Sequence, residues 1–202
     1  MKKKIFVLAT AFSLLFLSDS GYSRDGAFEF GDTYVGIGTS FGYFNFYGSY
    51  SSASVPVVVF AEYGLKKYIS LGGFMGIQNY SYESFYHDGL PPYSKIYYSY
   101  NCSAVSLGLK GSFHVLPYIN DRYDARVDDS QMDAYITAVL GSTFHSYNEV
   151  TATGYNYTTQ RNRLVFGPSL GFRYMIAPRV GAFIELGVGA FGLSTGGVVF
   201  DL

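Results

Sequence analysis

Residues 103–115 read SAVSLGLKGSFHV, a stretch in which bulky apolar residues alternate with small or polar ones. Successive side chains of a β-strand point to opposite faces, so this alternation divides the stretch into two faces of different character. One face carries Val105, Leu107, Leu109, Phe113 and Val115. The other carries Ala104, Ser106, Gly108, Lys110, Ser112 and His114. The pattern predicts a strand with one bulky apolar face and one face of small residues.

The same two-residue period recurs along most of the chain, whereas no segment shows a convincing helical period. We predict strands at residues 33–43, 57–65, 69–80, 103–115, 134–145, 163–176, 180–190 and 195–202. About eight strands joined in sequence predict an all-β fold, an antiparallel up-and-down β-barrel. Pro168 falls inside one of these strands, where it removes a hydrogen-bond donor, and the sequence suggests only a bulge there.

The composition decides which face of this barrel is outside. Charged residues make up only 14% of the chain, against about 25% in ordinary soluble proteins. A soluble lipid-binding barrel would place its bulky residues inside and cover its surface with charge, but here the non-apolar face is mostly Gly and Ser. We therefore predict a transmembrane barrel with its bulky face toward outer-membrane lipid. The net charge of -1 argues against nucleic-acid binding, and the single Cys excludes a disulfide framework within the chain.

The N-terminus has the pattern of an export signal. Three lysines at positions 2–4 precede an apolar run over residues 5–17, and small and polar residues follow. A membrane anchor, the alternative, would need about 20 apolar residues. We predict a cleaved signal peptide over residues 1–23 and an outer-membrane barrel domain over residues 24–202. The expected location is the cell outer membrane of a Gram-negative bacterium.

The predicted connections alternate in length. Long Tyr-rich connections at residues 44–56, 81–102 and 146–162 are expected on the cell surface, and short turns at 64–67 and 177–179 on the periplasmic side. The Asp-rich connection 116–133 is also periplasmic by this count, as a solvated loop or as a docking site for a periplasmic partner. Interfacial girdles are expected from Tyr43, Tyr63, Tyr68, Tyr135 and Tyr174.

The C-terminal part also resembles a known family. Residues 167–189 read GPSLGFRYMIAPRVGAFIELGVG and the chain ends in GGVVFDL, while AEYGL at 61–65 and DAYITAVLG at 133–141 are similar to earlier strands. This pattern resembles the bacterial outer-membrane protein β-barrel domain family, the small porin-like group of eight-stranded barrels. The resemblance implies that the barrel-insertion machinery reads Phe200 and Leu202 as a C-terminal assembly signal. Leu202 departs from the aromatic residue usual in the family at that place.

Four charges fall on the predicted lumen face: Glu62, Lys110, Arg173 and Glu185. They sum to zero, and burial in so narrow an interior favours mutual pairing. We predict a charge cluster that plugs the lumen. A gated ion path is the alternative.

The expected function is that of a small closed barrel acting through its extracellular loops, in adhesion, surface protection or membrane integrity. A narrow channel for small apolar solutes is the alternative, and a lipid A-modifying enzyme is third. Ser112 and His114 share a face but lie near the periplasmic end, so we predict no catalytic residues, and no cofactor or metal site. The expected partners are outer-membrane lipid, the barrel-insertion machinery during biogenesis and an extracellular ligand.

Overall fold

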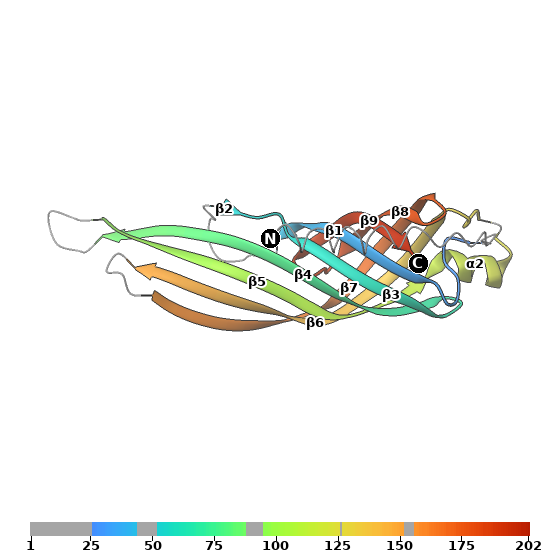
Figure 1. The fold of residues 1–202 in the computed structure, drawn as a ribbon. Helices are drawn as coiled ribbons and strands as arrows, with labels where there is room; N and C mark the ends of the chain where they lie inside the picture. The colour runs from blue at the N-terminus through green and yellow to red at the C-terminus, as the bar shows by residue number, and fades with distance from the viewer. Residues whose placement is uncertain (1–25, 44–51, 88–94, 126, 152–155) are drawn as a thin grey trace, which may run out of the picture.

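The computed structural model describes residues 26–43, 52–87, 95–125, 127–151 and 156–202. Within them, eight strands close into one antiparallel ring, drawn in Figure 1. The strands of the ring are β1 (Thr33–Tyr43), β3 (Val57–Lys66), β4 (Ile69–His87), β5 (Lys95–His114), β6 (Met132–Thr151), β7 (Asn156–Ala177), β8 (Val180–Gly187) and β9 (Gly192–Asp201). The signal peptide predicted for residues 1–23 lies outside the described residues.

Each strand of the ring pairs with its neighbours in the chain, and β1 pairs with β9 to close the barrel. The closing register places Tyr34 opposite Asp201 and Val35 opposite Phe200. The two-residue strand β2 (Ser52–Ala53) pairs only with β4. The predicted antiparallel up-and-down barrel of about eight strands is therefore confirmed.

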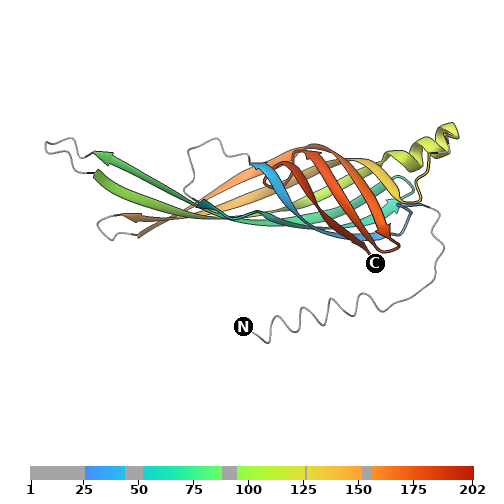
Figure 2. The ribbon, with the colours of Figure 1, turned by 90° about the horizontal axis from the view of Figure 1, so that it is seen from above.

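The strands fall into two length classes. β1, β3, β8 and β9 have 11, 10, 8 and 10 residues, close to the roughly 9–11 that a tilted strand needs to cross a bilayer. β4, β5, β6 and β7 have 19, 20, 20 and 22 residues, and they project far beyond the other four (Figures 1 and 2). We call the projecting part the outer sheet: residues 79–87 of β4, 95–103 of β5, 145–151 of β6 and 156–163 of β7.

The outer sheet corrects the prediction that residues 81–102 and 146–162 are long loops. The ladder between β4 and β5 continues to His87↔Lys95, and that between β6 and β7 continues to Val150↔Asn156. The sequence concealed these strands because their residues are polar at both alternating positions, so the contrast between faces that marks a barrel strand is missing. Their Tyr and Thr content nevertheless favours the extended backbone.

A short helix, α2 (Val115–Tyr123), lies at the opposite end of the barrel (Figure 2). It corrects two predictions: the strand predicted over 103–115 ends at His114, and the connection 116–133 is only partly loop. Pro117 stands in the first turn of the helix, where its missing donor costs nothing. The ring of Tyr118 packs against Phe113 and Tyr68, with centroid distances of 5.3 and 5.5 Å. Nine residues are too few for a helical period to stand out in the sequence.

The assignment of the two strand faces is correct. Leu109 and Phe166 are 60% and 69% exposed on the outer wall, whereas Ser106 and Lys110 are at most 2% exposed in the lumen. Among the tyrosines predicted for the girdles, Tyr63 and Tyr174 are exposed. Tyr135 was predicted wrongly, because it is 2% exposed and lies in the lumen. The side chain of Tyr43 lies outside what the structure describes.

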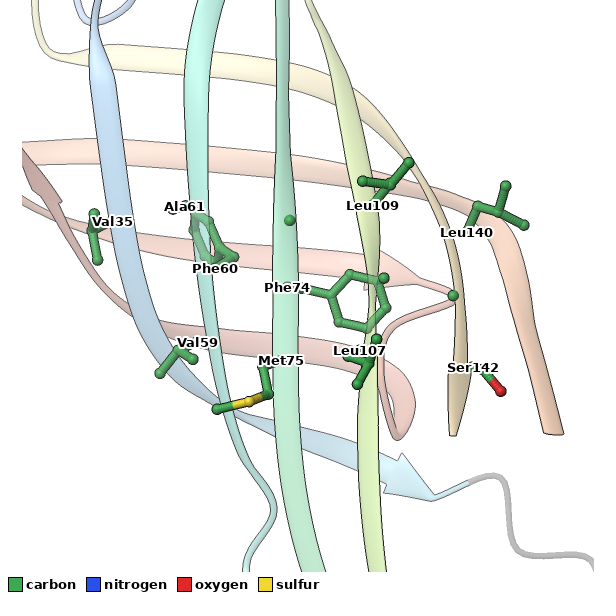
Figure 3. Close-up of a pocket in the computed structure, with 13 residues that line it drawn as sticks. Val35, Val59, Phe60, Ala61, Phe74, Met75, Leu107, Leu109, Leu140 and Ser142 are labelled. Atoms are coloured by element: carbon green, nitrogen blue, oxygen red, sulfur yellow. The ribbon is translucent and has the colours of Figure 1, made fainter. Parts of the chain in front are cut away.

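The outer wall is not uniformly convex. A shallow, almost wholly apolar hollow of about 770 Å³ crosses β1, β3, β4, β5 and β6 (Figure 3). Bulky side chains such as Val59, Met75 and Leu107 border it, while Ala61 and Gly73 leave room between them. The hollow lies in the same wall as the exposed apolar residues.

Pro168 has a structural explanation that the sequence did not reveal. The backbone N–H of Val188 donates to the carbonyl oxygen of Pro168 across 3.0 Å, so the backbone polar groups of Pro168 face β8. β8 pairs with β7 in register only from Gly187↔Ser169 onward. The missing donor of Pro168 therefore lies at the point where the β7–β8 ladder ends, which is where a strand tolerates proline.

Candidate functional site

The structure brings all four predicted lumen charges into one ion-pair network. Nζ of Lys110 lies 3.0 Å from Oε1 of Glu62 and also forms an ion pair with Glu185. A guanidinium nitrogen of Arg173 lies 3.6 Å from Oε2 of Glu62. All four residues are at most 9% exposed. At such burial, charges are tolerated only when they are paired, and here each one faces an opposite charge.

Two further residues belong to this network. Asp133 lies 3.6 Å from Arg173, and its carboxylate is 2.9 Å from Nδ1 of His114. Asp133 was predicted as the end of a solvated loop, but it is part of β6 and 1% exposed. Asp133, Tyr135 and Thr137 occupy alternate positions of the strand and all point into the lumen. This alternation is the sequence signal that could have identified Asp133 as a lumen residue.

The guanidinium of Arg173 is held by charge and by aromatic faces. It makes no hydrogen bond to the described residues, and its carboxylate partners lie at 3.6 Å. Its central carbon lies 3.9 Å from the ring centroid of Tyr34 and 5.3 Å from that of Tyr135. A cation over a ring face is attracted by the ring quadrupole, and the attraction is larger where water is excluded.

Hydroxyl groups add further hydrogen bonds to the carboxylates of Glu62 and Glu185. Ser112 donates to Oε1 of Glu62 at 3.1 Å, and Ser70 is 3.4 Å from Oε2. The Tyr135 hydroxyl donates to Glu185 at 2.9 Å. The network is therefore hydrogen-bonded as well as paired, which buried carboxylates require.

Three lumen side chains contact one another in the same order as the hydroxyl, imidazole and carboxylate of an acyl-transfer triad: Ser70, His114 and Asp133. Oγ of Ser70 lies 3.0 Å from Nε2 of His114, whose Nδ1 faces Asp133. His114 thus pairs with Ser70 on β4, whereas Ser112, which shares its strand face, donates to Glu62. Ser70, His114 and Asp133 are each at most 1% exposed, so a substrate cannot reach the hydroxyl in this conformation. A catalytic role needs space for a substrate beside the nucleophile, and the burial of Ser70 leaves no such access in this conformation.

A segment before β1 covers this end of the lumen. The ring of Phe28 stacks on the ring of His114, with centroids 3.4 Å apart and planes 6° apart. The Ala27 N–H donates to the carbonyl of Asp129 at 2.6 Å, and the Tyr34 hydroxyl donates to the carbonyl of Ala27. Both Ala27 and Phe28 are buried. Residues 26–32 therefore form a cover over the charge network at the α2 end.

The outer-sheet side of the lumen is filled differently from the prediction. Instead of Gly and Ser alone, buried Phe60, Phe74, Phe183 and Phe191 form an apolar layer. The rings of Phe60 and Phe183 meet edge to face with centroids 5.1 Å apart. Nζ of Lys110 lies 3.9 Å from the ring centroid of Phe60, which joins the apolar layer to the charge network.

Where the outer sheet leaves the barrel, polar aromatic residues line the side of the long strands that continues the lumen. The Tyr80 hydroxyl lies 3.3 Å from that of Tyr147 and 3.4 Å from Nδ1 of His145. Cys102, a buried free thiol, lies 3.9 Å from the same nitrogen. Cys102 shares the lumen side of β5 with Ala104 and Ser106, and nothing in the sequence indicated its contact with His145.

Outside the barrel, Asp121 of α2 ties the helix to the β3–β4 turn. Its carboxylate accepts hydrogen bonds from Lys67 and Tyr68. These bonds lower the pKa of the Asp121 carboxyl and raise the pKa of the Lys67 ammonium.

The predicted assembly residues lie at the closing strand. Phe200 of β9 is opposite Val35 of β1 and Val180 of β8. Leu202 is 52% exposed, and its N–H donates to the carbonyl of Thr33 at 3.0 Å.

Within the described ranges, no group of three or more His, Cys, Asp or Glu side chains is arranged to hold a metal ion. In the same ranges, no helix is long and apolar enough to span a membrane.

The sequence matches no protein-family model. It also matches no curated protein. Among solved structures, it is similar to the N-terminal β-barrel domain of Pseudomonas aeruginosa OprF, with 13% identity, 86% of this chain and 98% of that chain covered, and a TM-score of 0.47. It is also similar to Ail, the attachment invasion locus protein of Yersinia pestis. One Ail structure gives 11% identity, covers 85% of this chain and 95% of that chain, and has a TM-score of 0.42. The structure of Ail in complex with the heparin analogue sucrose octasulfate gives 10% identity, covers 84% of this chain and 93% of that chain, and has a TM-score of 0.43. The likeness to these structures is one of fold alone, and the described part of this chain forms a closed eight-stranded barrel.

Proposed function

We propose that this protein is a closed barrel of the Gram-negative outer membrane, exported by a cleaved signal peptide over residues 1–23. The bulky outer wall and the low charge of the chain support this location, because exposed apolar surface on this scale is stable only against lipid. The apolar hollow of Figure 3 suits lipid acyl chains, the expected neighbours of the wall.

The lumen is proposed to be sealed twice. The charge network around Lys110 fills the half next to α2, and the apolar layer around Phe74 fills the half next to the outer sheet. An eight-stranded barrel has an interior that side chains alone can fill. This packing supports the plug over both the gated ion path and the channel for small apolar solutes.

The outer sheet is proposed to do the work of the protein, by binding an extracellular ligand in adhesion or surface protection. The observation that carries this proposal is the length of β4–β7, about twice what crossing a membrane requires. A transmembrane anchor alone would not need a sheet outside the membrane. Membrane integrity remains the competing role, because it would rest on the barrel and not on the sheet.

Assembly is proposed to depend on β9, as the resemblance to outer-membrane barrels implies. Phe200 alternates with Val199, which is fully buried in the lumen, so Phe200 lies on the lipid side with Leu202. Replacing Phe200 with Ala should lower the amount of folded barrel in the membrane. Replacing Leu202 with Phe should leave it unchanged or raise it, and heat-modifiability on gels measures both.

Shortening the outer sheet tests the proposed function. One variant replaces residues 81–101 with an Asn-Gly turn between the paired residues Tyr80 and Cys102. A second replaces residues 147–159 with the same turn between Ser146 and Gln160. Cells that carry each variant are assayed for surface binding and for detergent permeability.

The expected result is loss of surface binding with unchanged permeability. A matched control is Arg122→Ala on α2, at the opposite end of the barrel, which should alter neither readout. Increased permeability with intact binding supports membrane integrity as the role, and an unchanged result in both assays removes the basis for both roles.

A further inference from the structure

The outer sheet has an open edge along β7. β6 pairs with β7 from Val150↔Asn156 onward, so one side of the strand is occupied along its whole length. On the other side, β8 supplies partners only from Ser169, apart from the single bond to Pro168. In the part of the chain that the structure describes, residues 156–163 thus have no strand on that side.

The direction of the backbone groups at this edge follows from two hydrogen bonds. The N–H of Met175 donates to the carbonyl of Gln131, which directly precedes β6, and the carbonyl of Pro168 accepts from Val188 next to β8. The backbone N–H and C=O groups of successive residues in a strand point alternately to its two neighbours, and the β6–β7 register is unbroken. In β7, the backbone groups of odd-numbered residues therefore point to β6, and those of even-numbered residues point to the β8 side. The N–H and C=O groups of Gln160 and Asn162 therefore point to the open edge.

The edge is hydrophilic and basic. Residues 158–163 are exposed, and they include Arg161 and Arg163 but no acidic residue. The two arginines alternate with buried Val165, which places them on the concave side of the strand. Leu164, 71% exposed, is the outermost bulky residue of the lipid-facing wall on β7, so the open edge begins where the apolar wall ends.

These charges decide what can pair with the edge. A charged edge strand resists pairing with strands of the same charge. Two copies of this chain paired antiparallel about Arg161 would place the two Arg161 side chains directly opposite each other, and like charges so placed are destabilising. An acidic strand gains both the backbone bonds and the charge attraction.

We propose that the open edge of β7 binds an extended acidic segment of a partner protein by strand addition. Main-chain hydrogen bonds from Gln160 and Asn162 supply affinity, and Arg161 selects for Asp or Glu opposite it on the incoming strand. This inference rests on the proposed role of the outer sheet, and it names the class of partner.

The test uses the full-length protein in detergent micelles and three fluorescent eight-residue peptides: alternating Thr-Glu, alternating Thr-Lys, and Thr-Glu with alternate backbone nitrogens methylated on the edge-facing side. Fluorescence anisotropy should detect binding of the first peptide only, because methylation removes strand donors and lysine repels the edge. Binding should weaken as salt is raised, since the charge pairs are exposed.

Two variants locate the site. Gln160→Pro with Asn162→Pro removes two edge donors without removing a bond to β6, and should weaken the Thr-Glu peptide at least about tenfold. Arg161→Glu should shift the preference toward the Thr-Lys peptide. Phe85→Pro is the matched control. The Ser54 N–H donates to the carbonyl of Asn79, so the backbone groups of odd-numbered residues in β4 point away from β5. A proline at position 85 therefore removes a backbone donor at the opposite edge of the outer sheet.

Heat-modifiability on gels establishes that each variant is folded. Equal binding of the methylated and unmethylated peptides, no binding of any peptide, or concentration-dependent self-association of the protein overturns the inference. If the shortened outer sheet abolishes surface binding while no acidic peptide binds, the proposed function stands and strand addition at β7 fails.

Discussion

At the scale of single residues, the cation of Arg173 holds two acids in the lumen. Arg173→Met keeps the length of the side chain but leaves Glu62 and Asp133 without that counter-charge. Removing one partner of a buried ion pair typically costs about 3–5 kcal/mol. We expect a loss of this size in urea unfolding in micelles, followed by tyrosine fluorescence, since the chain has 21 Tyr and no Trp.

Two further variants make that result specific to the network. Arg122→Met on the exposed last turn of α2 should change the free energy of unfolding by less than about 0.5 kcal/mol. Adding Asp133→Asn to Arg173→Met should recover part of the loss, because one uncompensated charge is removed. Equal losses in Arg173→Met and Arg122→Met would show that the ion pairs do not stabilise the barrel.

Close approach of β3 and β4 at Gly72 gives a second prediction. A Cβ there would lie 1.8 Å from the carbonyl oxygen of Ala61 and 2.7 Å from Cα of Glu62, so Gly72→Ala must displace backbone beside the network. We expect a loss of at least about 1–3 kcal/mol in urea unfolding. Gly111→Ala is the control, because the nearest atom to its Cβ is a Leu71 methyl at 3.7 Å. Indistinguishable variants contradict the crowding argument.

Alternation alone was enough to find part of the lumen cluster. Lys110 and Arg173 stand out because a charge interrupts a run of small residues on one face of a strand. Asp133 was missed because it follows an Asp-rich loop, where one more acid carries no contrast. The contact between Ser70 and His114 depends on the register of β4 against β5, which side-chain alternation within one strand does not contain.

At the scale of elements, the strands of the barrel wall could be predicted and their extensions into the outer sheet could not. A barrel strand has one apolar face, so β1 was predicted with the bounds that it has, residues 33–43. In the outer sheet, polar residues occur at both alternating positions of the sequence, so hydrophobic contrast disappears although the pairing continues. The helix α2 was missed for a related reason: none of its residues is fully buried, so no apolar stripe marks it.

The tie between α2 and the β3–β4 turn should depend on pH. A carboxyl with a lowered pKa, as in Asp121, contributes stability above its unfolded pKa and loses it as pH falls through the folded value. An ammonium with a raised pKa, as in Lys67, contributes below its unfolded pKa and loses it as pH rises. The tie should therefore be complete between about pH 4 and about pH 10.

The ring resonances of Tyr118, measured by NMR in micelles, report this tie because Tyr118 packs on Tyr68. They should shift with a midpoint below the ordinary aspartate value of about 3.9. Asp121→Asn should abolish the shift, whereas Asp128→Asn should not, because Asp128 bonds within its own loop to Ser130. A midpoint that survives Asp121→Asn assigns the titration to another group.

At the scale of the whole molecule, the proposed double seal consists of two unlike layers in one narrow lumen. We expect the apolar layer of Phe60, Phe74, Phe183 and Phe191 to exclude ions because it cannot solvate them. We expect the network around Lys110 to exclude apolar solutes because they cannot replace the partners of its buried charges. Closure should survive the loss of either layer by itself.

Planar-bilayer recordings test this double seal. The intact protein should show no steady conductance, and neither should Phe74→Ala with Phe191→Ala, which thins the apolar layer alone. Glu62→Gln, Lys110→Met and Glu185→Gln together remove three charges of the network without leaving a lone charge on those three residues, and this variant should also stay closed. Combining the two sets should allow ions through, provided that heat-modifiability shows a folded barrel. Steady large conductance from the intact protein contradicts the closed barrel, whereas conductance from either partial variant shows that a single layer makes the seal.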